Sequence, residues 1–409
     1  MPLSQTKQVM NVKTRIAVNE DLDNNTVRRV RELDGWRAIS VLFVIFHHIL
    51  GYQHHSFVSQ FPLLDHGIEY LGQLGVKIFF VISGFVICRL LISEELRNKA
   101  VSLKAFYYRR IFRILPPFYL YLITLSLLLR SKLIRESWWA IVSSGLFLFD
   151  IGRITPHSWF VGHTWSLALE EQFYLIFPTM FVLIPKAWRG RAFGATFVLL
   201  VTWNLSMVHT GWHAVISTDS RAGFACICCG VLMAIYERSV RAVAGGVPGF
   251  LVMLAGLILL VHPVGVRNGT AAVYESLFVP PAIGLVLMFS LGRGAWLRAF
   301  LCSKSVQAVG LTSYGIYLWQ QLFTCPQFYL AGGMPQPYFS GTGRIIPSLV
   351  PLLCVIVPLS YVFVEKPAMR YGRFLSRRAI RRVIRDPLGV EPAERQIGPP
   401  QELVNESDA

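Results

Sequence analysis

Ten apolar segments of roughly membrane-spanning length constrain the fold of this chain more than any other feature. A transmembrane helix needs about 20 predominantly apolar residues to cross the hydrocarbon core. The segments are 37–52, 74–92, 114–129, 172–186, 193–209, 222–237, 247–263, 272–291, 308–325 and 345–364. The stretch 138–149 is apolar but short, and we expect it to be partial or re-entrant. The sequence therefore predicts an all-α, polytopic transmembrane helical bundle of about ten spans.

Composition excludes an ordinary soluble domain. The chain is 54% hydrophobic and 15% charged, whereas soluble domains carry about 25% charged residues. The net charge of +16 does not indicate a nucleic-acid partner, because the basic residues lie at the ends of apolar segments and in the C-terminal region. Most of the seven cysteines fall inside apolar segments, so we interpret them as packing residues and expect no metal.

The basic residues also predict the orientation in the membrane. They are frequent in residues 1–36 and 93–113 and absent from 51–76. Because cytoplasmic loops are enriched in Lys and Arg, we expect both termini to be cytoplasmic. The basic residues Arg130, Lys132 and Arg135 contradict this pattern, since the same topology places them outside.

The chain divides into three expected regions. Residues 1–30 form a cytoplasmic N-terminal arm, 31–368 a transmembrane domain, and 369–409 a basic juxtamembrane helix with a disordered tail. The arginines after 366 predict contact with anionic membrane lipid. We expect the first span to act as an uncleaved insertion signal, since the polar N-terminal arm resembles no cleavable signal peptide.

The first span carries an arginine at its start and two histidines deep inside. Arg37 and His48 are eleven residues apart, about three full helical turns, so they share a face, while His47 points roughly 80° away. Ionisable groups inside a membrane span usually mark function. A neutral imidazole can take a proton from a hydroxyl, so His48 is a candidate general base. The alternative is a structural histidine bound to a neighbouring helix.

Three further segments contain candidate residues. Glu170 and Glu171 precede an apolar run, and a carboxylate there can orient an imidazole; the alternative is a solvated helix end. Arg109, Arg110 and Arg113 can bind the phosphates of a soluble donor, or can merely anchor the chain at the membrane surface. Lys77 lies within a span close to the small pair Ser83–Gly84, which permits close helix packing or leaves room for a ligand. Supporting positions around the site are expected at Asp34, Lys77, Ser83, Glu171 and Tyr314.

Taken together, the following ordered segments over about residues 31–368 resemble the acyltransferase family 3 proteins, the integral-membrane O-acyltransferases of bacteria. The matching segments are LDGWRAISVLFVIFHH, FFVISGF with YRRIFRILPP, TWSLALEEQFYLIFP, SYGIYLW and VEKP. The resemblance implies a bacterial inner-membrane enzyme of roughly ten spans. Such an enzyme transfers an acyl group, usually acetyl, from acyl-CoA to a hydroxyl of a surface polysaccharide, a lipid-linked sugar or a secreted glycoside.

The resemblance also implies residue roles. His48 matches the family's catalytic histidine, Arg37 its partner, Arg110 and Arg113 the arginine pair that meets the donor, and Glu170 the acidic position. The family often has histidine where this chain has Gln320, so we assign Gln320 no role. Some members also carry a fused hydrolase-like domain, which we do not expect here.

The sequence thus supports one hypothesis and two rivals. In the first, acyl-CoA binds near Arg109, Arg110 and Arg113, and His48, held by Glu170, activates the acceptor or takes the acyl group itself. Arg37 then stabilises negative charge on the donor or on the tetrahedral intermediate. A secondary transporter of an anionic or sugar-linked substrate is the main alternative, although we find no repeated halves. A silent membrane scaffold is the third.

Overall fold

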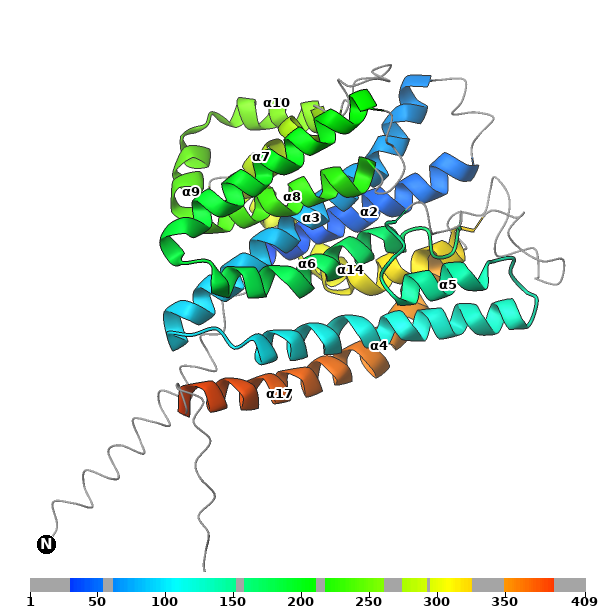
Figure 1. The fold of residues 1–409 in the computed structure, drawn as a ribbon. Helices are drawn as coiled ribbons and strands as arrows, with labels where there is room; N and C mark the ends of the chain where they lie inside the picture. The colour runs from blue at the N-terminus through cyan, green and yellow to red at the C-terminus, as the bar shows by residue number, and fades with distance from the viewer. Residues whose placement is uncertain are drawn as a thin grey trace, which may run out of the picture.

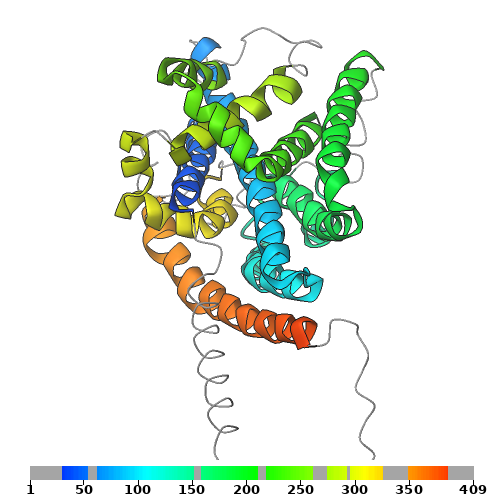
Figure 2. The same ribbon diagram turned by 90° about the vertical axis from the view of Figure 1, so that its left-hand side faces the viewer.

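The computed structural model describes residues 30–53, 62–151, 158–210, 218–260, 274–292, 295–325 and 349–385. Within these ranges the chain is helical, with no β-strand. Residues 1–29 of the N-terminal arm lie outside the described residues, and so does the tail after 385, the segment for which we predicted disorder. Figures 1 and 2 show the helices gathered into one bundle, with α17 along one side of it.

The helices before residue 240 are α2 (Arg31–Gln53), α3 (Pro62–Asn98), α4 (Leu103–Arg130), α5 (Trp138–Gly145), α6 (Thr164–Leu183), α7 (Lys186–Thr210), α8 (Thr218–Ile235) and α9 (Glu237–Gly246). The remaining elements are α10 (Gly249–Leu260), η2 (Tyr274–Phe278), α12 (Val279–Gly292), α13 (Ala295–Leu301), α14 (Lys304–Phe323), η5 (Leu352–Ile356), α16 (Val357–Ser360), η6 (Tyr361–Glu365) and α17 (Lys366–Arg385).

The prediction of an all-helical protein is confirmed. Four helical stretches are long and apolar enough to cross a membrane by length and composition: Tyr70–Asn98, Leu103–Arg130, Tyr274–Leu291 and Leu349–Arg381. The α8–α9 pair, bent by 94° at its break, meets the same test when taken together. The short segment 138–149 forms only the eight-residue helix α5.

The helices α2, α3, α8 and α14 form the centre of the bundle, with α3 packed between α2 and α8 (Figure 1). Close packing of α3 on α8 depends on Gly84, where a Cβ atom would lie 2.0 Å from the backbone oxygen of Ile227. Gly310 has the same role between α14 and α2, because a Cβ there would lie 1.9 Å from the backbone oxygen of Asp34. These contacts fix the relative positions of the helices that carry the site.

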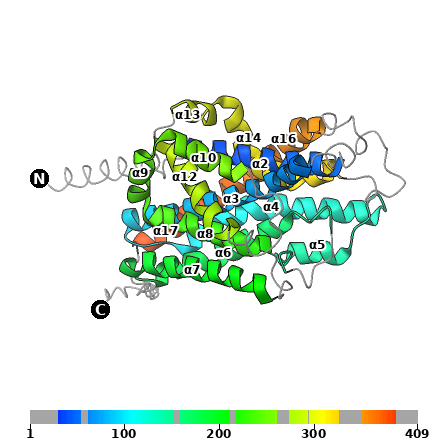
Figure 3. The same cartoon turned by 90° about the horizontal axis from the view of Figure 1, so that it is seen from above.

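One end of the bundle, which we call the basic end, gathers arginines with acidic partners. It holds the start of α2, the end of α3 and the start of α4, and its ion pairs are Arg89–Glu237, Arg109–Glu94, Arg189–Glu95, Arg241–Glu237 and Arg298–Glu32. The last described turn of α17 also lies at this end (Figure 3). Arg130, Lys132 and Arg135, at or just beyond the end of α4, are exposed at the opposite end.

The basic helix predicted after residue 366 is present as α17, and it packs along α4 (Figure 1). Arg109 joins the two helices, because its guanidinium donates to Ser376 Oγ at 2.7 Å and to Glu94 at 2.9 Å. Gly372 faces Phe112 of α4, where a Cβ would lie 2.7 Å from the Phe112 Cβ. The side chain of Arg109 therefore holds α17 and α3 against α4.

A buried ion pair lies between α3 and η2. Lys77 Nζ is 2.9 Å from Glu275 Oε1, and both side chains are almost fully buried. Beside them, Ser276 accepts a hydrogen bond from Asn204, whose side-chain oxygen accepts from Arg221. This polar network ties α3, α7, α8 and η2 together inside an otherwise apolar part of the bundle.

Candidate active site

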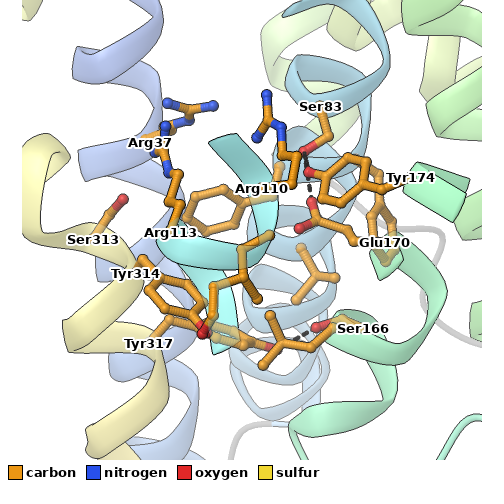
Figure 4. Close-up of a pocket in the computed structure, with 15 residues that line it drawn as sticks. Arg37, Ser83, Arg110, Arg113, Ser166, Glu170, Tyr174, Ser313, Tyr314 and Tyr317 are labelled. Atoms are coloured by element: carbon orange, nitrogen blue, oxygen red, sulfur yellow. Dashed lines mark hydrogen bonds between the residues drawn. The ribbon is translucent and has the colours of Figure 1, made fainter. Parts of the chain in front are cut away.

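A cavity in the middle of the bundle brings four of the predicted catalytic and donor-binding residues together. Arg37 of α2, Arg110 and Arg113 of α4, and Glu170 of α6 all line it (Figure 4). Helical spacing explains the clustering on α4, because residues three apart share a face. Three guanidinium groups against one carboxylate leave this cavity with excess positive charge, which suits an anionic ligand.

Three of the charged groups in this cavity, Glu170, Arg110 and Arg37, have a local partner. The carboxylate of Glu170 accepts a hydrogen bond from Ser83 Oγ at 2.6 Å, and Tyr174 donates to the same serine hydroxyl at 3.1 Å (Figure 4). The guanidinium of Arg110 lies over the ring of Tyr174, 5.0 Å from its centroid. Arg37 is 3.5 Å from Asp34 on the preceding turn of α2. The supporting positions predicted at Ser83 and Asp34 thus contact the predicted site residues.

A second cavity opens beside the first, toward the basic end. It shares Arg37, Arg113 and Tyr314 with the first cavity and adds Arg89 and Arg373. Sequence reasoning missed these last two arginines, because they lie on α3 and α17, outside the motifs. The shared residues make the two cavities neighbours, so a long anionic ligand can extend from the basic end into the bundle.

His48 lies outside both cavities, at a deeper level of the bundle. Its Nδ1 is 3.2 Å from Gln320 Oε1 and its Nε2 is 3.4 Å from Gln321 Nε2, both on α14. The ring of Trp159 packs edge-on against it, with centroids 5.7 Å apart. His163 in turn contacts Gln321 through its Nδ1. We call His48, Gln320, Gln321, His163 and Trp159 the histidine cluster.

The shared helical face of Arg37 and His48 does not bring them into contact. Eleven residues of helix separate them by about 16 Å at 1.5 Å per residue. Nor does Glu170 hold His48 as we expected: its carboxylate bonds Ser83, whereas the contacts of His48 within the described ranges are with the histidine cluster and His47. Arg37 and His48 therefore lie at two different levels of the bundle.

A hydrogen-bonded pair separates the two levels. Ser166 Oγ and Tyr317 Oη are 2.6 Å apart at the end of the cavity away from Arg37 (Figure 4). The Tyr317 hydroxyl also reaches the backbone oxygen of His163 at 2.9 Å. On α14, Gln320 and Gln321 follow Tyr317 by one turn, so the histidine cluster begins directly behind this pair.

The other predicted supporting residues have varied places. Tyr314 lines both cavities and donates to the Ile114 backbone oxygen at 2.9 Å. Lys77 lines neither of these two cavities, because it pairs with Glu275. Glu171 is also outside them, and its buried Oε1 has no hydrogen-bond partner among the described residues. Arg109 is held by Glu94 and Ser376, as described above.

A carboxylate holds the segment Ser158–His163, which carries Trp159 and His163, in place. Glu136, in the connection between α4 and α5, accepts hydrogen bonds from the Ser158 hydroxyl and from the Ser137 backbone N–H. Burial raises the pKa of the Glu136 carboxyl above its ordinary value, and these hydrogen bonds only partly oppose the shift.

Glu136 should make the stability of the protein pH-dependent. Because its folded-state pKa lies above the unfolded value, its contribution to stability is greatest below pH 4.5 and falls as the pH rises through the folded pKa. We expect Glu136→Gln to flatten this decline. Thermal unfolding of both proteins at several pH values between about 4 and 8 measures how their stability changes with pH. If stability declines with pH as steeply in the variant as in the unaltered protein, this assignment is wrong.

Fold and site together define a helical membrane protein with an arginine-lined internal cavity and a partly buried histidine inside the bundle. The chain belongs to acyltransferase family 3, whose family model, described as an acyltransferase domain, matches residues 30–365.

Curated relatives agree with this assignment. O-acetyltransferase OatA of Staphylococcus aureus, in strains NCTC 8325 / PS 47, COL and MRSA252, is 27% identical over 379 residues, covering 83% of this chain and 57% of OatA. The chain thus spans somewhat more than half the length of these relatives. No solved structure matches the chain significantly.

Proposed function

We propose that this protein is a membrane O-acyltransferase that moves an acyl group, most simply acetyl, from acyl-CoA to a hydroxyl of a carbohydrate-type acceptor. The observation that carries the proposal is the cavity in which Arg37, Arg110 and Arg113 meet Glu170, in a chain of this family. Surface polysaccharides, lipid-linked sugars and secreted glycosides are the acceptor classes we infer from the resemblance. Relatives named O-acetyltransferase support the choice of acetyl.

The protein is proposed to lie in a bacterial inner membrane with about ten spans and both termini cytoplasmic. Two features support this orientation. The start of α2 and the later turns of α17 lie at the same end of the bundle, where Arg373 and Asp34 line one cavity. That end also carries most of the paired arginines, as expected for a cytoplasmic face.

Donor binding follows from the two joined cavities. The phosphates of acyl-CoA occupy the outer cavity, where Arg89, Arg113 and Arg373 offer guanidinium groups. The extended pantetheine arm then passes Arg37 and Arg110 toward Ser166 and Tyr317. Arg37 acts on the donor rather than on the reacting carbonyl, because about 16 Å of helix lies between it and His48.

Transfer itself is proposed to occur at the histidine cluster. His48 Nε2 takes the proton of the acceptor hydroxyl while the hydroxyl oxygen attacks the thioester carbonyl carbon. The C–S bond then breaks, and the proton on His48 passes to the departing CoA thiolate. A short-lived acyl group on His48 Nε2 gives the same products in two steps. In either route the Ser166–Tyr317 pair must move aside for the thioester to reach His48.

An assay with purified protein in liposomes tests this function. Supplied with labelled acetyl-CoA, the protein should release free CoA only when an acceptor hydroxyl is present, and the label should appear on the acceptor. A set of mono- and oligosaccharides serves as the acceptor probe. Accumulation of an intact solute inside the liposomes, without cleavage of the thioester, would favour the transporter alternative instead.

The donor site makes a separate prediction about arginines. Hydrogen bonds to charged groups contribute about 1.5–3 kcal/mol each, so Arg113→Met and Arg373→Gln should each weaken CoA binding by roughly 10- to 100-fold. Arg370→Gln is the matched control, because Arg370 is exposed on the same helix as Arg373 but lines neither cavity. Calorimetric titration of the detergent-solubilised protein with CoA gives the affinities. Equal losses in all three variants would mean that only overall charge attracts the donor.

A further inference from the structure

We propose that Gln320, Gln321 and His163 are positioning residues that hold His48 in one tautomer, with its proton on Nδ1 and the Nε2 lone pair available. The inference rests on the proposed function, in which His48 Nε2 is the base. It adds three residues that touch the imidazole or its immediate partner, and it gives a role to Gln320, to which sequence reasoning assigned none.

The assignment begins at a donor whose direction is fixed. The backbone N–H of His163 can only donate, and it donates to Gln321 Oε1 at 3.3 Å. His163 Nδ1 contacts the same oxygen, so that ring nitrogen must also carry its proton. Two donors converging on one atom identify it as the amide oxygen. The other end of the Gln321 amide is therefore the NH₂ group.

That NH₂ group determines the state of His48. Gln321 Nε2 lies 3.4 Å from His48 Nε2, and because an amide nitrogen only donates, the imidazole must present a lone pair there. In a neutral ring the proton is then on Nδ1. Gln320 Oε1 accepts this proton at 3.2 Å. All four contacts agree on a single arrangement of protons, with no conflict between neighbouring donors.

The arrangement also leaves the base available. A contact of 3.4 Å is long for an N–H donor, so an acceptor hydroxyl can displace the Gln321 amide from His48 Nε2. The titratable groups near His48 are His47 on its own helix and His163 beside α6, and no carboxylate contacts it within the described ranges. Neutral amides therefore replace the aspartate that orients the histidine in hydrolytic triads.

Nitrogen NMR of the full-length protein tests the tautomer directly. The chain has ten histidines, so the His48 signals in a sample with ¹⁵N-labelled histidine are assigned by their loss in His48→Gln. We expect the protonated nitrogen to be Nδ1. A proton on Nε2 would overturn the proposal whether or not the protein transfers acyl groups. Conversely, absence of transfer with Nδ1 protonated would overturn only the proposed function.

Two isosteric variants test whether the amide matters for the reaction. In Gln320→Glu, a carboxylate accepts the Nδ1 proton and favours the imidazolium, so the acid limb of the kcat/KM profile should move up by about one pH unit or more. In Gln320→Met, the acceptor is lost, and kcat should fall roughly 10- to 100-fold with an unchanged KM for the donor, because a mis-set tautomer lowers turnover.

The control variant is Gln172→Met, whose amide bonds the Phe147 backbone and Asp150, away from the histidine cluster. Its pH profile should match that of the unaltered protein. If Gln320→Glu and Gln320→Met reduce turnover equally and leave the acid limb in place, Gln320 serves packing alone and the proposal is wrong.

Discussion

Replacing His48 with glutamine lowers acceptor-dependent acyl transfer by about 10²- to 10⁴-fold, the range in which general acid–base catalysis contributes. Glutamine can still hydrogen-bond Gln320 and Gln321, but it cannot take a proton from a hydroxyl. Binding of CoA should stay unchanged, because His48 lines neither donor cavity and Arg37, the donor-site arginine on the same helix, lies about 16 Å away along α2. The loss of activity should therefore appear in kcat. Calorimetric titration with CoA compares the donor affinity of the variant with that of the unaltered protein.

The adjacent histidine is the matched control. His47 is turned about 100° from His48 on the helix, and its ring packs beside Gly72, where a Cβ would lie 2.6 Å from the imidazole. His47→Gln should keep most of the transfer activity. Full activity of His48→Gln, or equal loss in both variants, would show that the reaction does not depend on the histidine cluster.

Replacing Lys77 with methionine destabilises the fold by about 3–5 kcal/mol, since breaking a buried ion pair by removing one partner is strongly destabilising. The charge left behind is Glu275, nearly fully buried against α3. Removing both charges in Lys77→Met/Glu275→Leu should restore most of the stability, because well-packed apolar residues often replace a buried pair without loss. Thermal unfolding in detergent measures both variants.

This experiment also decides between two roles for Lys77, which the sequence marked as a candidate supporting residue of the site. Because Lys77 pairs with Glu275 away from the cavity, the double variant should show normal transfer per folded molecule. A double variant that is stable but inactive would show that Lys77 takes part in the reaction. A Lys77→Met variant as stable as the unaltered protein would show that the ion pair does not stabilise the fold.

The all-helical fold could be predicted from the sequence because long apolar segments are typical of membrane helices, although only four described helical stretches, or five with the bent α8–α9 pair, meet the length and composition test for a span. Each of the ten predicted segments overlaps a helix of the structure, in part or whole, and the short segment 138–149 forms only α5. The helix ends were harder to place. α3 continues to Asn98, well past its apolar part, because Glu94 and Glu95 find arginine partners at the basic end.

Most residues of the site could be predicted from the sequence, but the contacts between them could not. Residue types and helical spacing selected Arg37, His48, Arg110, Arg113 and Glu170, and four of these line one cavity. Spacing within a helix cannot show which neighbour a side chain meets, so the expected Glu170–His48 contact was wrong: Ser83 of α3 bonds Glu170. The contacts of His48 with α14 join residues 272 and 273 positions apart. A polar pair within an apolar run, Gln320–Gln321, was the only available signal.

The central claim is that the donor reaches from the arginines of the basic end to the histidine cluster. Photocrosslinking tests it most directly, with an acyl-CoA that carries a diazirine in its acyl group and peptide mapping by mass spectrometry. The account predicts labelling at His48, Gln320 or the adjoining Tyr317 and Ser166, suppressed by excess CoA and by Arg113→Met. Labelling confined to exposed surfaces such as the outer face of α17, or unaffected by CoA, would contradict it.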